Sequence, residues 1–251
     1  MNAWRLVGRN LLVYRRSWLI FLTGFAEPVF YLLSIGIGVG AMIGGVEVGG
    51  RVVEYAAFVA PAMLATSAAN GAIMDSTFNV FFRLKHARLY DAILTTPMTT
   101  ADVAVGETLW ALLRGGVYAG GFLLVMAALG YVNSWWALLA LPATLLVGFC
   151  FAGLGLWLTT YMGSWKDFEY ISLALMPMVL FSGTFFPVDA YPAAVRLLVE
   201  ATPLYRSVVL CRELTTGALT TGSLLSVAYL AALGLLGGLM ARRRLDRLLL
   251  T

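Results

Sequence analysis

The chain has 251 residues, of which 61% are hydrophobic and only 12% are charged, and its net charge at pH 7 is +4. Soluble domains carry about a quarter charged residues. This composition therefore excludes an ordinary soluble protein and predicts an all-α polytopic membrane protein. The basic residues stand at the ends of apolar segments rather than in a patch with polar surface between them, which argues against nucleic-acid binding.

Residues 1–17 predict an amphipathic helix that lies on the membrane surface. Helical spacing puts Trp4, Val7, Leu11 and Tyr14 on one face, with arginines on the other. Such a helix binds an anionic lipid surface. The alternative is the start of a cleaved signal peptide, but the apolar stretch that follows is long and lacks a clear small-residue cleavage site.

Six apolar segments are each predicted to cross the membrane, because about 20 apolar residues suffice to do so. They are residues 18–43, 55–81, 103–131, 135–161, 171–186 and 219–241. Six spans place both termini on one side. Twelve Lys and Arg residues lie on that side, against four in the opposite connections. The positive-inside rule therefore predicts that both termini are cytoplasmic.

A charged segment, residues 81–97, separates the second span from the third and is patterned as an amphipathic helix. One face is predicted to carry Phe82, His86, Leu89 and Ile93, and the other faces Arg83, Lys85, Arg88 and Asp91. Pro97 is expected to end this helix. Thr99 and Asp102 then form a capping box that starts the next helix. From the pattern alone, a solvated helical loop remains an alternative.

The segment after the fifth span does not fit a simple loop. Ser182-Gly183 and Pro187 break the helix, and two short apolar stretches follow at residues 193–201 and 204–210. They are too short to span. Irregular backbone at membrane depth needs cover from protein or a water-filled cavity, so two re-entrant or interfacial helices are expected on the outer side. The alternative is an amphipathic loop on the outer leaflet.

The sequence lacks the residues for nucleotide binding or hydrolytic chemistry. A phosphate loop ends in Lys followed by Ser or Thr, but neither Lys85 nor Lys166 is followed by one. His86 is the only histidine, and the two cysteines, Cys150 and Cys211, are isolated. No catalytic residue, metal site or cofactor of this chain is therefore expected.

Ionisable residues inside spans are costly and so are candidates for function. They are Glu27, Asp75, Glu107 and Arg114. Glu27 and Arg114 are each expected about 15 Å deep, at 1.5 Å per residue. Arg114 has three possible partners, Glu27, Asp75 and Glu107, and the sequence leaves the choice open. A structural ion pair between helices is favoured over proton transport.

Together these features resemble the membrane-spanning subunits of type 2 ABC exporters, and especially the subgroup typified by the permease for nodulation-factor export and its drug-export relatives. The resemblance covers nearly the whole chain. It rests on the surface helix before the first span and on the runs LTTPMTTADVAVGE, FSGTFFPVDAYP and ATPLYRSVVLCREL. The last two runs are fairly specific in combination, whereas six spans alone would not be.

The resemblance implies one transmembrane domain, residues 1–251, in a bacterial plasma membrane. It implies that the segment 81–97 is a coupling helix that docks on a separate ABC ATPase dimer, which holds ATP and Mg. The implied docking residues are Phe82, Arg83, Lys85, His86, Arg88, Leu89, Tyr90 and Ile93. Residues 183–213 would form short outer helices that cap the pathway, and their break would lie at Gly183, Phe185, Phe186 and Pro187.

The function that the resemblance implies is export of an amphipathic or lipid-linked substrate, such as a glycolipid, by two permeases that meet around a conduit. The second permease would be another copy of the chain or a similar protein. A drug-efflux permease of the same architecture is an alternative. Two readings from other classes are a lipid-modifying membrane enzyme, which lacks the acid, base or metal residues it would need, and a homo-oligomeric channel.

Overall fold

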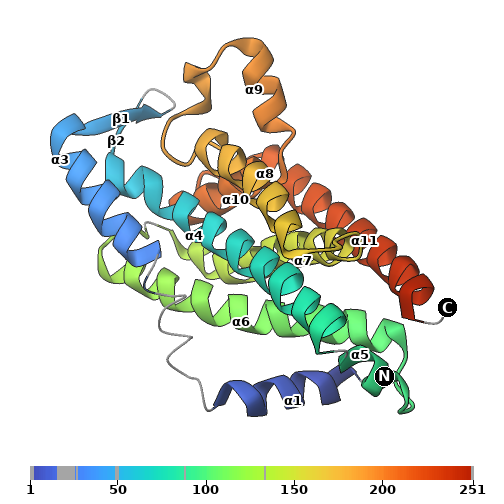
Figure 1. Cartoon of the computed structure of the whole chain (residues 1–251). Coiled ribbons are helices and arrows are strands. Elements are labelled where there is room, and N and C mark those ends of the chain that lie inside the picture. The colour runs from blue at the N-terminus through green and yellow to red at the C-terminus, as the bar shows by residue number, and fades with distance from the viewer. Residues whose placement is uncertain are drawn as a thin grey trace.

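A computed structural model describes residues 3–15, 26, 28–48, 51–87, 89–132 and 134–249, and this part of the chain is mostly helical (Figure 1). The α-helices are α1 (Ala3–Arg15), α3 (Gly40–Ile43), α4 (Tyr55–Met74), α5 (Leu89–Leu94), α6 (Thr100–Ala128), α7 (Ala140–Thr159), α8 (Phe168–Phe181), α9 (Ala193–Glu200), α10 (Pro203–Thr216) and α11 (Thr221–Leu249). Short π-helical segments are Leu32–Val39, Asp75–Asn79 and Phe82–His86, and 3₁₀ turns are Trp135–Leu139, Trp165–Asp167 and Val188–Ala190.

Within the described residues, four helices are long and apolar enough to cross a membrane. They run over Tyr55–Lys85, Thr100–Ala128, Trp135–Thr159 and Thr221–Leu249, and they match the second, third, fourth and sixth expected spans. The expected first span falls partly outside the described residues. The fifth corresponds to α8, which has 14 residues. At 1.5 Å per residue α8 is about 21 Å long, shorter than the hydrocarbon core of a bilayer.

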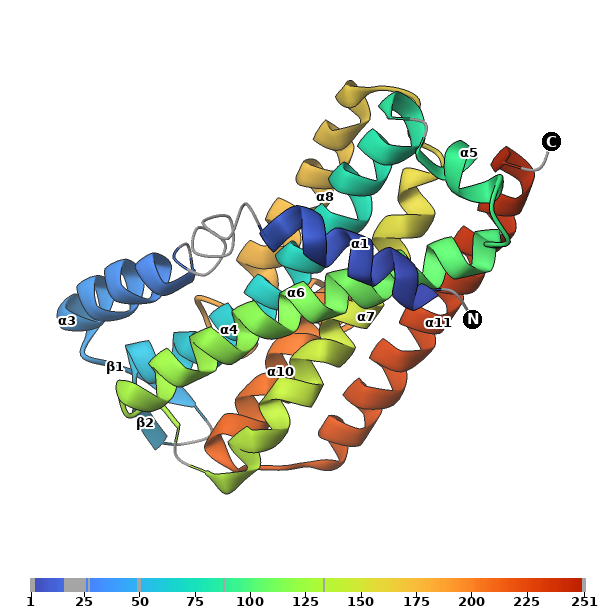
Figure 2. The ribbon, with the colours of Figure 1, turned by 90° about the horizontal axis from the view of Figure 1, so that it is seen from below.

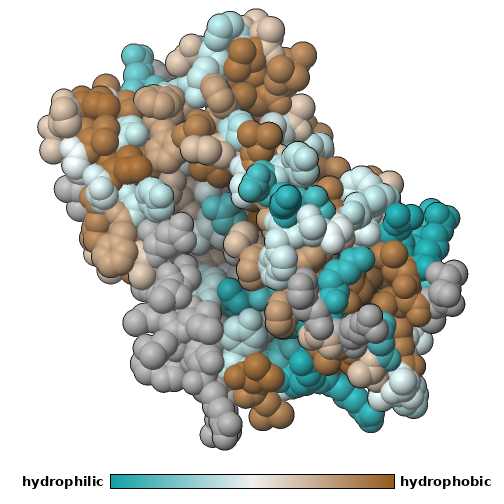
Figure 3. Space-filling model, in the orientation of Figure 1, coloured by the Kyte–Doolittle hydropathy of each residue, from teal (hydrophilic) through white to brown (hydrophobic). Residues whose placement is uncertain are grey.

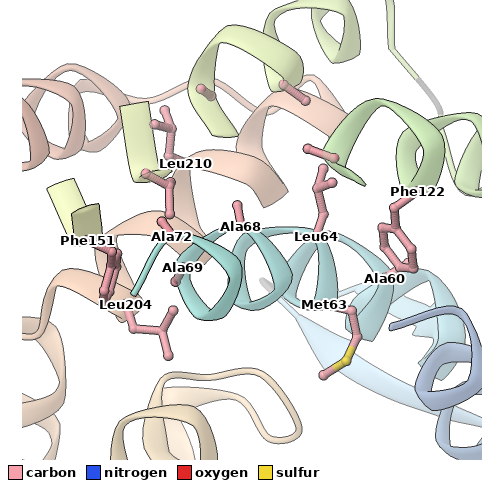
Figure 4. Close-up of a cluster of buried hydrophobic side chains, with 14 of the residues drawn as sticks. Ala60, Met63, Leu64, Ala68, Ala69, Ala72, Phe122, Phe151, Leu204 and Leu210 are labelled. Atoms are coloured by element: carbon pink, nitrogen blue, oxygen red, sulfur yellow. The ribbon is translucent and has the colours of Figure 1, made fainter. Parts of the chain in front are cut away.

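Helix α4 lies at the centre of the fold. It is apolar on all sides, as expected for a helix that other helices surround. Its side chains Leu64, Ala68 and Ala72 are buried and belong to a cluster that includes Phe122 of α6 and Phe151 of α7 (Figure 4). The alanines allow close approach of neighbouring helices, which is how helices pack inside membranes.

The polar, Gly-rich composition of residues 44–54 predicts a short loop before α4, but the structure has a β-hairpin there. Strand β1 (Gly45–Val48) pairs antiparallel with β2 (Arg51–Glu54), with Val46 opposite Val53. Valine favours the pleated backbone, and polar composition does not exclude a strand. The prediction of a loop was therefore wrong at this point.

The two ends of the molecule differ in polarity. Both views place the two ends of the chain and α5 toward one end of the molecule, whereas α3 and the hairpin lie toward the opposite end (Figures 1 and 2). Hydrophilic residues gather around α5 and the end of α11, while hydrophobic residues cover α3 and α9 (Figure 3). The basic segments used for the topology prediction therefore share one end.

Candidate functional site

The segment expected to dock on an ATPase is divided into two pieces. The sequence predicted one helix over residues 81–97, but the structure has a π-helical turn, Phe82–His86, followed by α5, Leu89–Leu94. The turn closes with a hydrogen bond from the Ala87 N–H to the Phe82 carbonyl, at 2.9 Å. The single-helix prediction is therefore corrected. Because the helical phase changes at the break, the two pieces do not share one continuous face.

The exposed surface of this segment differs from the predicted face. Phe82 is 50% exposed, and Lys85, Asp91 and Ala92 are exposed as well. Ile93 packs partly buried beside Leu6 and Leu245 of a second apolar cluster. Tyr90 is only 1% exposed and points into the protein. Arg88 lies outside the described residues.

Tyr90 fixes α5 to the third span through a buried carboxylate. The Tyr90 hydroxyl donates a hydrogen bond to Glu107 Oε1 at 2.9 Å. The other oxygen of Glu107 forms an ion pair with Arg83 Nη1 at 2.5 Å. The side chains of Arg83 and Glu107 are 12% and 4% exposed. One carboxylate of α6 therefore joins both pieces of the segment expected to dock on an ATPase, which we call the docking segment (residues 82–94).

The Tyr90 phenol keeps its proton at physiological pH. Burial raises its pKa well above the ordinary value of tyrosine, and the nearby negative charge of Glu107 raises the pKa further. A neutral phenol donates to the carboxylate, whereas a phenolate would repel it. The contact between α5 and α6 is therefore maintained across the physiological pH range.

Arg114 pairs with Asp75, one of the three partners that the sequence left open. Arg114 Nη1 lies 2.8 Å from Asp75 Oδ1, and Asn79 Nδ2 donates to the same oxygen at 2.5 Å. Asp75 and Asn79 begin and end a π-helical turn in the second span. Such turns are frequent at functional sites. Glu27, the first candidate partner, lies outside the described residues.

The N-terminal helix α1 reaches the same network. The guanidinium of Arg114 lies 5.5 Å from the ring centroid of Tyr14 and equally far from that of Tyr118. Arg114 Nη1 also donates to the Tyr14 hydroxyl at 3.4 Å. Composition and spacing did not single out Tyr118, since it looks like an ordinary span residue. We call Asp75, Asn79, Arg83, Tyr90, Glu107 and Arg114, with Tyr14 and Tyr118, the charged network.

Helix α1 lies across α6 (Figure 2). The predicted apolar face of α1 is therefore partly buried against the protein and partly exposed. Val7 is buried against the protein, while Trp4 and Leu11 are 67% and 53% exposed. Gly106 of α6 allows the close approach, because a Cβ there would lie 3.1 Å from Leu6 Cβ. The exposed apolar edge of α1 suits a lipid surface, and the buried edge holds the helix on α6.

The beginning of α6 agrees with the prediction. Thr99 Oγ1 accepts a hydrogen bond from the Asp102 N–H at 3.2 Å, and Asp102 Oδ2 accepts one from the Thr99 N–H at 3.1 Å. The predicted capping box is therefore confirmed. It sets where the third span begins, two turns before Glu107.

The turn between α7 and α8 packs on the charged end of the second span. The rings of Trp165 and Phe168 lie 5.0–5.3 Å from those of Phe78 and Phe81. Asp167 closes the turn by accepting from the Gly163 N–H at 2.7 Å and the Ser164 N–H at 3.0 Å. These hydrogen bonds lower the pKa of the Asp167 carboxyl below its usual value.

Acidification is expected to weaken this turn. Because the pKa of Asp167 is lower in the folded state, its carboxylate stabilises the turn above about pH 4, and this stabilisation is lost as the pH falls further. At about pH 6 the melting temperature of Asp167→Asn should therefore lie below that of the wild type, and the difference should shrink as the pH falls below about 4. A difference that stays constant across this range would contradict the role given to the carboxylate.

The predicted break after the fifth helix lies where expected. Helix α8 ends at Phe181, and Gly183 has a φ of +73°, which favours glycine. Phe186 is 56% exposed, while Phe185 is partly buried. The short helices α9 and α10 follow. These residues do not contact the charged network, which is at the other end of α4.

Apolar spanning helices and a surface helix, with a buried charged network at one end, together define a multi-pass membrane protein. Residues 1–214 match the ABC-2 type transporter family, and the chain belongs to that family. It is therefore a transport permease subunit of an ABC exporter and not an enzyme. The expected resemblance is confirmed.

Individual relatives extend the match over nearly the full chain. A protein named Nodulation protein J from Rhizobium leguminosarum bv. viciae is 36% identical over 254 residues, covering 98% of this chain and 95% of that protein. Nodulation protein J from Rhizobium leguminosarum bv. trifolii is 37% identical over 86% of this chain and 80% of that protein. That from Bradyrhizobium diazoefficiens is 32% identical over 98% of this chain and 93% of that protein.

Proposed function

We propose that the charged network transmits movement of a docked ATPase to the second and third spans. The observation that supports this proposal is the position of Glu107, whose carboxylate binds Tyr90 of α5 and Arg83 of the preceding turn at 2.9 and 2.5 Å. Displacement of α5 would therefore pull on α6 directly. A docked helix that moves as a rigid body is a known way to convert ligand binding into domain movement.

The second span is coupled to the third a little deeper in the bundle. The Asp75–Arg114 pair joins these spans at 2.8 Å, and Tyr14 adds the surface helix α1. Leaving one charge of a buried pair without its partner costs about 3–5 kcal/mol. Because of that cost, movements that keep Asp75 and Arg114 paired are favoured. Helix α1 and the two spans would therefore move together.

The ATPase, its ATP and its Mg belong to a separate chain in this proposal. ABC-2 permeases work with ABC ATPase partners, and the wild-type chain is expected to bind an ATPase dimer through the exposed side of α5. A second copy of the chain, or a similar permease, would complete the conduit. The shared end of the basic segments supports a cytoplasmic position for both termini and α5 in a bacterial inner membrane.

The proposed substrate is amphipathic or lipid-linked, such as a lipo-oligosaccharide. The names of the relatives refer to nodulation, and the resemblance implies a substrate with an acyl chain. A groove of about 690 Å³ between α6 and the Trp135–Leu139 turn adds structural support. It is lined mainly by apolar side chains, among them Leu123, Leu124 and Leu138. Such a lining suits an acyl chain better than a polar polymer.

Adding a charged side chain to the exposed side of α5 tests the docking proposal. Ala92→Arg places a long charged side chain on the exposed side of α5, away from Tyr90 and Glu107, so the fold should be kept. Co-expression with the neighbouring genes of its own genome, followed by affinity purification of the permease, should recover at least about tenfold less ATPase than the wild type.

A charge change at the opposite end is the matched control. Glu47→Lys alters an exposed side chain of the hairpin and should leave ATPase recovery unchanged. Equal recovery with Ala92→Arg and the wild type would show that α5 is not the docking surface. Absence of any ATPase with the wild type would count against the proposed ATPase partner itself.

A further inference from the structure

Residues 182–186, which we call the outer turn, form a buried and irregular connection after α8. Ser182, Gly183 and Thr184 are all buried, and the hydroxyls of Ser182 and Thr184 lie 2.7 Å apart. Buried backbone groups outside regular structure need hydrogen-bond partners from elsewhere. The turn receives them from two other elements.

One arginine of α10 supplies the first of these partners. Arg212 Nη2 donates to the Gly183 carbonyl at 2.8 Å and to the Phe58 carbonyl of α4 at 3.3 Å. Its guanidinium also lies 4.0 Å from the centroid of the Phe58 ring. A single side chain therefore joins α10, α4 and the outer turn.

The second partner comes from the first turn of α4. The Tyr55 hydroxyl donates to the Phe185 carbonyl at 3.2 Å. The ring of Tyr205, also on α10, would lie 3.8 Å from a Cβ at Gly183. The outer turn is thus held on one side by α4 and on the other by α10.

Arg212 is bound differently from Arg196, which is held by carboxylates. Arg196 pairs with Asp189 and Glu200 at 2.7 and 2.8 Å. In the described part of the chain no carboxylate forms an ion pair with Arg212, and its buried Nε has no hydrogen-bond partner. A guanidinium in apolar surroundings is costly unless it is paired. Its carbonyl bonds and ring contact are what hold it in this position.

We propose that Arg212 is a positioning residue that holds the outer turn closed against α4 and α10. Opening of this end of the chain then requires the Gly183 and Phe58 carbonyls to leave the guanidinium. The contribution of that opening to export rests on the proposed function. The closure itself is a property of this chain alone.

A cysteine placed in the turn reports its opening. Thr184→Cys puts a thiol at a side chain that is 0% exposed. Replacing Cys211, the neighbour of Arg212, with alanine leaves Cys150 of α7, also buried, as an internal marker of overall packing. The purified chain in nanodiscs is treated with a water-soluble maleimide, and labelling at both positions is followed by mass spectrometry.

Removing the guanidinium should expose the reporter. In the Arg212→Met background, residue 184 should be labelled at least about tenfold faster than in the parent, as expected from losing hydrogen bonds to a charged donor. Arg212→Lys should be intermediate, since one ammonium lacks the planar fork and the ring contact. Arg206→Met should match the parent, because Arg206 bonds the Glu200 carbonyl and does not touch the turn.

Two results would overturn the proposal. An unchanged rate at residue 184 in both Arg212→Met and Arg212→Lys would show that the turn is closed without the guanidinium. An equal rise in labelling of Cys150 would show general loosening instead of local opening. If Arg212→Met gives no folded protein, the Lys variant decides. No ATPase is needed, so failure of the proposed coupling to an ATPase would leave this test intact.

Discussion

Replacing Glu107 with alanine is expected to destabilise the chain by about 3–5 kcal/mol, because it leaves the Arg83 charge buried without its partner. Arg83 Nη1 lies 2.5 Å from Glu107 Oε2, and the two side chains are 12% and 4% exposed. Water therefore screens the attraction between their charges little. For a chain of this size the melting temperature in detergent should fall by roughly 10 °C. Tyr90→Phe, which removes one hydrogen bond to the same carboxylate, should have a smaller effect of about 1.5–3 kcal/mol.

Removing both charges should reverse part of this loss. Buried ion pairs replaced by apolar residues of similar volume are often as stable as the original. The double variant Arg83→Met, Glu107→Met should therefore melt well above Glu107→Ala. It should stay below the wild type by about 1–3 kcal/mol, because the buried Tyr90 hydroxyl loses its acceptor. If the double variant were as unstable as Glu107→Ala, the cost would come from lost packing and not from an unpaired charge.

The second large effect is expected at the contact of α7 with α11, where two adjacent glycines should respond with opposite signs. A Cβ at Gly237 would lie 2.6 Å from the Gly153 carbonyl carbon and 2.7 Å from the Leu154 nitrogen. These are backbone atoms, which cannot move without shifting α7. Gly237→Ala should therefore destabilise the chain by about 3 kcal/mol, the upper end of what overpacking usually costs.

Its neighbour Gly238 is the matched control. No atom lies within 4 Å of a Cβ built there, so alanine only restricts the unfolded chain. Gly238→Ala should be neutral or stabilising by about 0.5–1 kcal/mol. Thermal unfolding of both purified variants checks the pair. Equal melting temperatures would mean that α7 and α11 do not approach each other as the structure shows.

Features set by neighbouring residues could be predicted from the sequence. The four long spans follow from local hydropathy, and the Thr99–Asp102 capping box requires only three-residue spacing. The end of α8 is likewise predicted by neighbouring residues, Ser182-Gly183 and Pro187. The hairpin also had a signal, since Gly49-Gly50 stands between two Val-rich runs.

Features set by contacts between distant residues could not be predicted. The docking segment breaks after His86 although its pattern fits one helix, and Tyr90 turns inward to a carboxylate 17 residues away. The partner of Arg114 depended on how the second and third spans are aligned, which spacing along one helix does not fix. The apolar face of α1 was correctly located as a stripe, but only the fold shows that part of it covers Gly106.

The measurement that tests the central claim most directly is the ATPase rate of the reconstituted complex with the Arg83→Met, Glu107→Met permease. In nanodiscs the wild-type permease should change the rate of its partner ATPase relative to the free ATPase. The double variant should still bind, because the exposed side of α5 is intact, but the rate should return to that of the free enzyme. If the double variant binds and changes the rate as the wild type does, the charged network does not carry the coupling.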